Sequence, residues 1–190
     1  MILEQLTRNR THRSFTKKEV PTDALRKMIE GARVGATTGN TQKLRFFLVN
    51  DPATCDAAFG QVRFAGLLPW NPTPEESPRA YIALCVSNEN LADYNPGFMG
   101  FDMGIAAQNI LLIANELGFA GCIVASYNKA EFDKIVKIPT GYQSAYIIAL
   151  GEPADTVTIV DVKDGDTKYY RDDKNNHFVP KLSLDQLILK

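Results

Sequence analysis

The stretch that most constrains this chain is an apolar run from Asp102 to Gly118, D-M-G-I-A-A-Q-N-I-L-L-I-A-N-E-L-G. At helical spacing its apolar side chains leave no wide polar face, unlike those of an ordinary surface helix. Asp102 is a residue type that caps a helix start, and Gly118 is a natural left-handed terminator. The run is too short and too interrupted by polar residues to span a bilayer. We therefore expect a helix that is covered on every side, by its own domain or by a second copy of the chain.

The overall composition is that of an ordinary soluble protein with a single domain over residues 1–190. The chain is 45% hydrophobic and 23% charged, and its net charge of −1 argues against a nucleic-acid or membrane surface. Its start has neither an apolar segment nor a cleavage site, so no secretion signal is expected. Three scattered cysteines and two isolated histidines match no disulfide framework and no metal signature. These features favour a cytoplasmic protein without a metal.

Four short apolar runs read as buried strands, and helical patterns separate them. The expected strands are residues 45–49, 81–86, 122–125 and 146–150. Besides the long run, helices are expected over residues 2–8, 22–32, 53–63 and 129–136, with Thr22 and Asn128 as caps of the second and fourth. Loops are expected over residues 35–42, 66–79 and 88–100. This order predicts a layered α/β or α+β sandwich.

The tail differs in kind from the rest of the chain. From Ala154 it is polar and irregular, except that residues 168–171 and 177–180 flank a polar segment and so predict a hairpin. A turn of helix is expected over residues 184–188. Such a tail cannot build its own core, so we expect it to lie across the main body or a partner. Arg171 is expected to pair with a neighbouring aspartate of the hairpin, although it is also a possible phosphate ligand.

Two polar segments carry groups suited to ligand binding. Arg10-Thr11-His12-Arg13 offers two guanidiniums and a hydroxyl, which match phosphate oxygens; a solvated basic turn is the alternative. Thr37-Thr38-Gly39-Asn40-Thr41-Gln42 gathers hydroxyls and amides that can meet the edge of a polar heterocycle; a plain polar turn is the alternative. Trp70, between prolines, is expected to serve as a packed lid or as a ring-stacking surface.

Taken in order, these segments resemble the FMN-dependent nitroreductase family. Arg10-Thr11-x-Arg13-x-Phe15 is similar to its R-S-x-R-x-F opening, and residues 36–42 are similar to its P-S-S-x-N-x-Q-P-W loop. Residues 102–127 resemble its D-x-x-x-A-A-Q-N segment and the C-x-I-G-G-F stretch that follows. Pro180-Lys181-Leu182-Ser183-Leu184 is similar to its closing basic-x-P-L-E-E stretch. The resemblance covers essentially the whole chain in the right order.

The resemblance implies a fold, a cofactor and a set of binding residues. It implies an α+β three-layer sandwich with a central mixed or antiparallel sheet, and a homodimer that shares two FMN sites between subunits. The phosphate and ribityl chain would be held by Arg10, Thr11, Arg13 and Lys181. The opposite subunit would bring Thr37, Thr38, Asn40 and Gln42 to the flavin. Ala125 and Ser126 would lie along the ring, with a backbone N–H near its N5 atom.

The implied activity is transfer of hydride from NAD(P)H through the flavin, in ping-pong fashion, to a nitroaromatic, quinone or related small acceptor. No residue of this chain is expected to be a catalytic acid or base, because the chemistry belongs to the cofactor. Trp70 and Phe98 are candidates to line the acceptor pocket. The main departures are threonines for serines, Ala36 for a proline, and Lys43-Leu44 for Pro-Trp. A non-catalytic flavin-binding, storage or sensor protein of the same fold is the alternative, and a dimer that has lost FMN is a third possibility.

Overall fold

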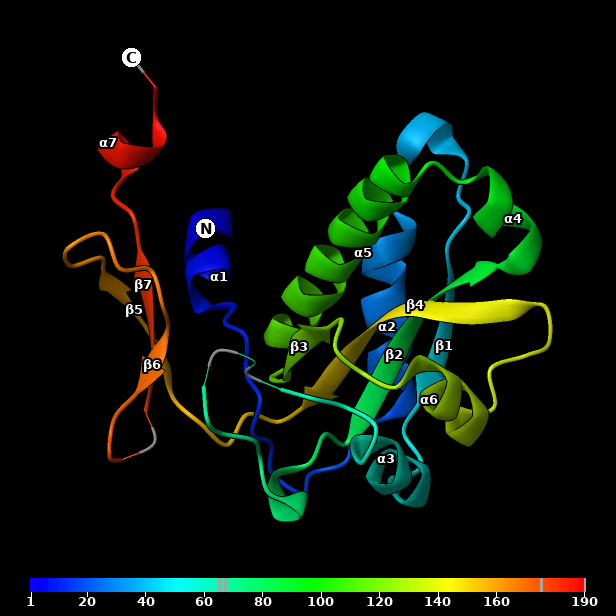
Figure 1. The fold of residues 1–190 in the computed structure, drawn as a ribbon, viewed down its shortest axis with the longest axis horizontal. Coiled ribbons are helices and arrows are strands. Elements are labelled where there is room, and N and C mark those ends of the chain that lie inside the picture. The colour runs from blue at the N-terminus through cyan, green and yellow to red at the C-terminus, as the bar shows by residue number, and fades with distance from the viewer. Residues whose placement is uncertain (65, 67, 175, 190) are drawn as a thin grey trace.

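The fold is built on a four-stranded antiparallel sheet, seen in a computed structural model that describes residues 1–64, 66, 68–174 and 176–189. The strand order is β1-β2-β4-β3, and every predicted apolar run is a strand (Figure 1). Adjacent strands pair in antiparallel register throughout, which narrows the expected mixed or antiparallel sheet to the antiparallel form. The strands are β1 (Arg45–Val49), β2 (Ala80–Ser87), β3 (Ala120–Val124) and β4 (Tyr142–Gly151).

Helices cover both faces of this sheet, so the α+β three-layer prediction is confirmed. Successive residues of a strand point to opposite faces. In β2, Ile82 and Leu84 therefore pack in one core with α2 (Thr22–Arg33) and α5 (Pro96–Glu116). The intervening Tyr81, Ala83 and Cys85 pack in a second core. That core is shared with α3 (Pro52–Phe59) and α6 (Lys129–Val136).

The long apolar helix is confirmed, but it begins earlier than expected. It starts at Pro96, and Asn95 caps it by accepting a hydrogen bond from the backbone N–H of Gly97 at 2.9 Å. Asp102 therefore lies inside the helix, and its predicted role as the cap is wrong. Gly118 does adopt the left-handed conformation, with φ of 80°, just beyond the last turn. A proline at the first helical position is compatible with a helix, because that position needs no backbone N–H.

Much of α5 is buried, yet one side of it is open in the single chain. Met103, Ala107 and Ile110 are buried in the core, whereas Phe98, Phe101 and Ile105 are 50%, 68% and 38% exposed. Among the described helices, only α5 has the length and apolar composition that would let a helix cross a membrane, so the expectation that this run is too short for that does not hold for the whole helix. Core helices of globular proteins meet the same criteria, and the buried side of α5 packs on the sheet as such a helix does.

Three boundary predictions are corrected by the structure. The expected loop over residues 88–100 contains α4 (Asn88–Asp93), capped by the Ser87 side chain, before α5 begins. Thr22 is the first helical residue and not the cap of α2; its hydroxyl accepts a hydrogen bond from the side chain of Asn50. The expected helix over residues 53–63 ends at Phe59. The other short elements are α1 (Ile2–Arg8), η1 (Thr38–Asn40) and η2 (Pro74–Glu76), and Asn128 does cap α6.

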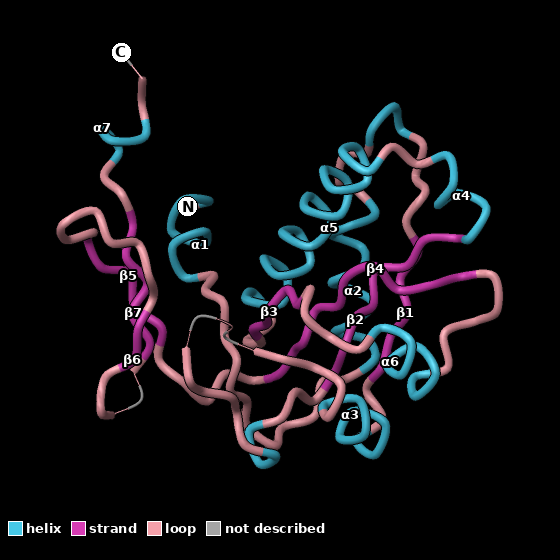
Figure 2. Tube along the Cα trace, in the orientation of Figure 1, coloured by secondary structure: helices cyan, strands magenta, loops and turns pink. Residues whose placement is uncertain are grey.

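The tail forms a small sheet of its own, of order β5-β7-β6. The predicted hairpin is confirmed as β6 (Tyr170–Arg171) and β7 (His177–Lys181), and the final turn as α7 (Leu184–Leu187). β5 (Val157–Asp161) lies in a segment expected to be irregular and pairs in parallel with β7. Figure 2 shows this sheet standing apart from the four-stranded one, with α1 between it and α5. Arg171 bonds to Asp155 at 2.8 Å, so its predicted pairing within the hairpin is wrong.

Candidate functional site

The basic segment of residues 10–13 is laid against the start of β3 by two close backbone contacts. Thr11 bridges to Gly121, and the backbone N–H of His12 donates to the Gly121 carbonyl at 3.2 Å. A Cβ at Gly121 would lie 2.6 Å from the carbonyl oxygen of Ala149, so only glycine fits there. At the other end of the segment, Phe15 is buried against Gly151. These contacts thus fix the backbone position of the segment that carries Arg10 and Arg13.

Four of the predicted binding residues meet at one cavity of about 430 Å³, which we call the basic cavity. Arg10, Thr11 and Arg13 line it from the N-terminal segment, and Lys181 lines it from the end of β7. Its described lining residues thus include three cations and no carboxylate. Such a lining favours an anionic ligand, because guanidinium and ammonium groups are the usual partners of phosphate oxygens.

The guanidiniums of the basic cavity retain bonding capacity. Nη2 of Arg10 donates to the carbonyl of Leu6 at 2.7 Å, while its buried Nε has no hydrogen-bond partner in the described part of the chain. Burial lowers the pKa of Arg10 from its ordinary value. Arg13 lies over the ring of Tyr169 at 5.1 Å, a cation–π contact. Both arginines are therefore oriented by the protein, and Arg10 keeps an unused donor.

β7 supplies one whole face to the basic cavity. His177, Val179 and Lys181 all line it, as alternate residues of a strand should. Only Lys181 had been predicted; the other two were missed, although strand alternation outward from Lys181 would have found them. The imidazole of His177 is 1% exposed and stacks on Tyr169 at 5.2 Å. Burial, Arg13 and Arg171 together lower the pKa of His177 to about 4, so it is neutral at pH 7.

The segment 37–42 does not reach the basic cavity within one chain. It lies beside the first half of α5, whereas the basic cavity lies beside the second half of α5, along Gln108 and Leu111, and β3 (Figure 1). The backbone N–H and the hydroxyl of Thr38 both donate to Asp102, at 2.7 and 2.9 Å. Thr37 and Gln42 line a separate cavity of about 220 Å³ between this segment and α2. A single chain therefore leaves Thr37, Thr38, Asn40 and Gln42 apart from Arg10 and Arg13.

The backbone of the segment 37–42 is held in an unusual conformation. Asn40 and Gln42 have φ of 53° and 49°, which non-glycine residues seldom adopt. The Thr37 hydroxyl accepts the backbone N–H of Gln42 at 3.3 Å, and the Gln42 amide donates to the Asn40 side chain at 3.2 Å. Strained residues of this kind cluster at ligand clamps and switches. Both amide side chains are exposed, so they are available to a molecule outside the chain.

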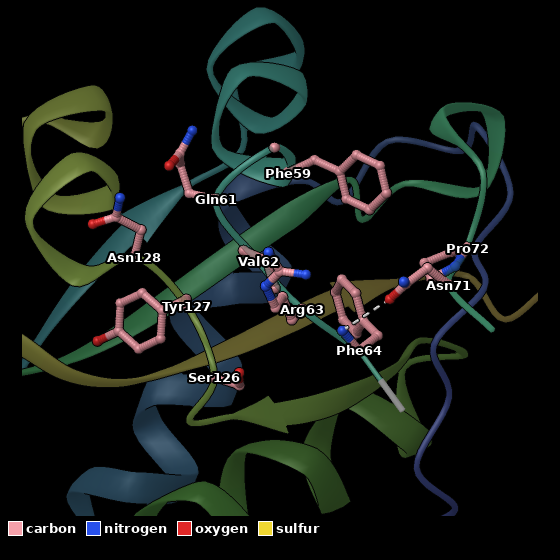
Figure 3. A pocket seen from close by; sticks show the side chains of 11 residues that line it. Phe59, Gln61, Val62, Arg63, Phe64, Asn71, Pro72, Ser126, Tyr127 and Asn128 are labelled. Carbon is pink, nitrogen blue, oxygen red and sulfur yellow. Dashed lines mark hydrogen bonds between the residues drawn. The ribbon is translucent and has the colours of Figure 1, made fainter. Parts of the chain in front are cut away.

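Ala125 and Ser126 lie exposed just beyond the end of β3. Ser126 accepts a hydrogen bond from the backbone N–H of Arg63 at 2.9 Å and lines a second, more open cavity of about 580 Å³. Figure 3 shows Arg63 next to Ser126, with Asn71 beyond Phe64, whose backbone N–H donates to the Asn71 side chain at 3.4 Å. β3 thus joins the two cavities: Ile123 lines the basic cavity, and Ser126 lines the open one.

Trp70 and Phe98, the residues expected to line the acceptor pocket, lie outside the lining of both cavities. The guanidinium of Arg171 lies over the Trp70 ring at 3.8 Å, so this indole is a stacking surface for a cation. Phe98 is half exposed on α5. The described lining of the basic cavity and of the open cavity includes neither ring. Their predicted role in an acceptor pocket is therefore without support from the cavities that the described residues line.

The structure offers no competing centre for metal or thiol chemistry in its described residues. No group of three or more histidine, cysteine, aspartate or glutamate side chains is placed to hold a metal ion there. Cys55, Cys85 and Cys122 are free and buried. Burial raises the pKa of Cys55 and Cys85 to about 12, so neither is a thiolate at neutral pH.

Comparison with known proteins gives the family of the chain. The model of the nitroreductase family matches residues 6–95 and 79–152. A "Putative NADH dehydrogenase/NAD(P)H nitroreductase" of Methanothermobacter thermautotrophicus is 26% identical over 87% of this chain and 84% of its own. A protein of the same description from Archaeoglobus fulgidus is 24% identical, and the match covers 80% of this chain and 86% of the relative.

Solved structures share the fold at low identity. An NADPH:FMN oxidoreductase from Vibrio harveyi, complexed with NAD⁺, has a TM-score of 0.66 at 20% identity and covers 99% of this chain and 76% of its own. An FMN-dependent nitroreductase from Clostridium difficile has a TM-score of 0.63 at 20% identity, and the match covers 90% of this chain and 93% of that one. Because the family model spans most of the sequence, the chain belongs to the nitroreductase family.

Proposed function

We propose that this protein is an FMN-dependent NAD(P)H oxidoreductase that holds its flavin with the phosphate in the basic cavity. The observation that carries the proposal is the meeting of Arg10, Arg13 and Lys181 around a cavity whose described lining holds no carboxylate. The similar solved structures are described as FMN enzymes, and the curated relatives as NAD(P)H nitroreductases. The cofactor, when bound, supplies hydride transfer between a nicotinamide donor and an acceptor.

The residues of the basic cavity fit the phosphate and ribityl chain of FMN. The unused Nε donor of Arg10 and the ammonium of Lys181 suit phosphate oxygens, and the exposed hydroxyl of Thr11 can bond to either group. Arg13, held over Tyr169, adds a third positive charge. Together these four residues neutralise the phosphate and fix its position.

The ring of the flavin would extend from the basic cavity along the end of β3. Ala125 and Ser126 are exposed there, and their backbone can approach the ring without any particular side chain. The open cavity beyond Ser126 offers room for the donor and the acceptor in turn, which supports ping-pong turnover. Its lining includes the cation Arg63 and the amides Gln61 and Asn71, which can donate hydrogen bonds to the nitro or carbonyl oxygens of nitroaromatic and quinone acceptors.

The segment 37–42 completes this site only if it comes from a second copy of the chain. Within one chain it lies away from the basic cavity, while the exposed Phe101 and Ile105 on α5 remain to be covered. A homodimer packed through α5 satisfies both conditions. Asn40 and Gln42 would then present their amides to the flavin. Thr38, whose hydroxyl already donates to Asp102, would hold the segment in place.

The test is anaerobic reduction of the flavin-loaded protein. We expect NADH or NADPH to bleach the absorbance of oxidised flavin, and a quinone or nitroaromatic to restore it. Absorbance that persists with both donors would instead support the alternative, a flavin-binding protein without turnover. Unchanged flavin content in the Arg10→Ala/Arg13→Ala double variant would contradict the proposed phosphate site. A Lys134→Ala variant, on the exposed side of α6, serves as the control for loss of a cation.

A further inference from the structure

His177 is a buried polar side chain that the proposed contacts leave unused. Its imidazole is 1% exposed, and neither ring nitrogen has a hydrogen-bond partner among the described residues. Buried polar groups of native proteins are almost always hydrogen-bonded, and an exception calls for an explanation. An unpartnered imidazole costs the protein free energy when it is removed from water. His177 also lines the basic cavity, so a bound ligand can supply what the chain does not.

The surroundings of His177 fix its orientation and its charge. Its ring stacks on the ring of Tyr169 at 5.2 Å, and the guanidinium of Arg13 also lies over the Tyr169 ring, at 5.1 Å. The nearby charges are those of Arg13 and Arg171, which disfavour a proton on His177, and of Asp155, which favours one; His12, when protonated, also disfavours it. A neutral imidazole carries one N–H donor and one acceptor nitrogen. It is therefore able to donate a hydrogen bond to an anion at neutral pH.

The position of His177 on its strand places it on the same surface as the cations. Residues 177, 179 and 181 of β7 all line the basic cavity, and Val157 of β5, paired with His177, lines it too. Along this face Val179 and Val157 are apolar, so His177 and Lys181 are the polar groups that β5 and β7 offer the ligand. A phosphate close to Arg13 would lie beside the imidazole, since both contact Tyr169.

We propose that His177 is a binding residue for the flavin cofactor and donates a ring N–H hydrogen bond to its phosphate. This assignment rests on the proposed function, because it takes FMN as the ligand of the basic cavity. It adds a neutral donor to a group of cations, so phosphate binding is strengthened without further positive charge. It also accounts for a histidine buried without a protein partner.

The test is the affinity of the full-length apoprotein for FMN and for riboflavin, followed by quenching of flavin fluorescence. The His177→Phe variant keeps a stacking ring but has no donor, and we expect it to bind FMN about ten- to a hundredfold more weakly. His177→Gln keeps an N–H donor and should retain most of the affinity. Riboflavin has no phosphate, so its affinity should be the same in all three proteins. Phe178→Leu, on the opposite face of β7, is the matched control and should bind both flavins normally.

Two outcomes would overturn the assignment: unchanged FMN affinity in His177→Phe, or an equal loss of riboflavin and FMN. If His177→Phe fails to fold, the ¹⁵N resonances of the His177 ring in the wild-type protein decide the matter. FMN should shift them and riboflavin should not; resonances that FMN leaves in place would also refute the assignment. Failure of the proposed function is distinguishable, since the wild-type apoprotein and Arg13→Ala would then bind FMN equally poorly.

Discussion

The carboxylate of Asp155 lies 2.8 Å from Nδ1 of His12 and joins the first segment of the chain to the last. Its other oxygen accepts a hydrogen bond from Arg171 at 2.8 Å, and its side chain is 3% exposed. His12 stands between the cavity-lining Thr11 and Arg13, whereas Arg171 belongs to the tail hairpin and covers Trp70. One buried carboxylate thus holds the tail sheet against the segment that we assign to phosphate binding.

Asp155→Asn should loosen this junction. Removing a buried charge that accepts two hydrogen bonds should lower the free energy of unfolding by about 3 kcal/mol, measured by urea denaturation at pH 7. FMN affinity should fall as well, because His12 would lose the contact that positions its neighbours. Asp161→Asn, which removes an exposed carboxylate from β5, should change neither quantity. Equal stability of Asp155→Asn and the wild type would show that the junction contributes nothing.

The stability difference between the wild type and Asp155→Asn should also depend on pH. Burial raises the pKa of Asp155, but the hydrogen bonds and charges of His12 and Arg171 outweigh it and leave the pKa lowered. A carboxyl whose folded-state pKa is depressed stabilises the fold above its unfolded pKa and loses this effect as the pH falls. The stability gap between wild type and Asp155→Asn should therefore be smaller at about pH 3 than at about pH 5, because it narrows as the carboxyl becomes protonated. A gap that widens as the pH falls from about 5 to about 3 would contradict this sign.

Asp102 should govern the order of the segment 37–42. Burial raises the pKa of this carboxyl, yet hydrogen bonds from Tyr94 and Thr38 leave it lowered, so it is charged at pH 7. In Asp102→Asn the Thr38 amide hydrogen should exchange faster by about ten- to a hundredfold, since a bond to a charged acceptor is lost. Hydrogen exchange measured by NMR tests this directly. Glu116→Gln, an exposed change in the last turn of α5, is the control and should leave Thr38 protected.

Much of the architecture could be predicted from the sequence because burial leaves a regular pattern. All four strands of the main sheet follow apolar runs, and α5 follows its apolar composition. What was missed depends on contacts between distant residues. β5 is half exposed and becomes a strand by pairing with β7, and Asp102 turns out to anchor Thr38 instead of capping a helix.

In the candidate site, too, residues with a local sequence pattern were predicted, and residues that depend on distant contacts were missed. Arg10, Thr11 and Arg13 were found because charged groups close in sequence remain close in space, and Lys181 was found by resemblance to the family. His177 was not, although it lies on the same face of β7 as Lys181, because the sequence alone does not show which face of this strand lines the cavity. Asp155 was missed for a similar reason, since its partners His12 and Arg171 come from opposite ends of the chain.

Gly121→Ala should damage both the fold and the flavin site. A Cβ there would lie 2.6 Å from the Ala149 carbonyl oxygen and 2.9 Å from Cδ2 of Leu111, so β3 would have to move. Overpacking of this kind costs about 1–3 kcal/mol, and the shift would displace the bridge to Thr11. Thermal unfolding and FMN affinity measure the two effects. Gly60→Ala is the control, because its added Cβ would make only an ordinary contact at 3.7 Å.

A second copy of the chain should be required for flavin binding, and α5 is where this can be tested. Phe101 and Ile105 are 68% and 38% exposed in the single chain, and large apolar side chains on one helix side are typical of a subunit interface. The double variant Phe101→Glu/Ile105→Glu should remain folded, because neither side chain belongs to the buried core. It should sediment as a monomer and lose its flavin, since Asn40 and Gln42 of a second chain could no longer reach the basic cavity. Ala130→Glu, on the exposed side of α6, adds a similar charge and should leave dimer and flavin intact. A folded monomer of the double variant that still binds FMN at wild-type affinity would show that one chain suffices.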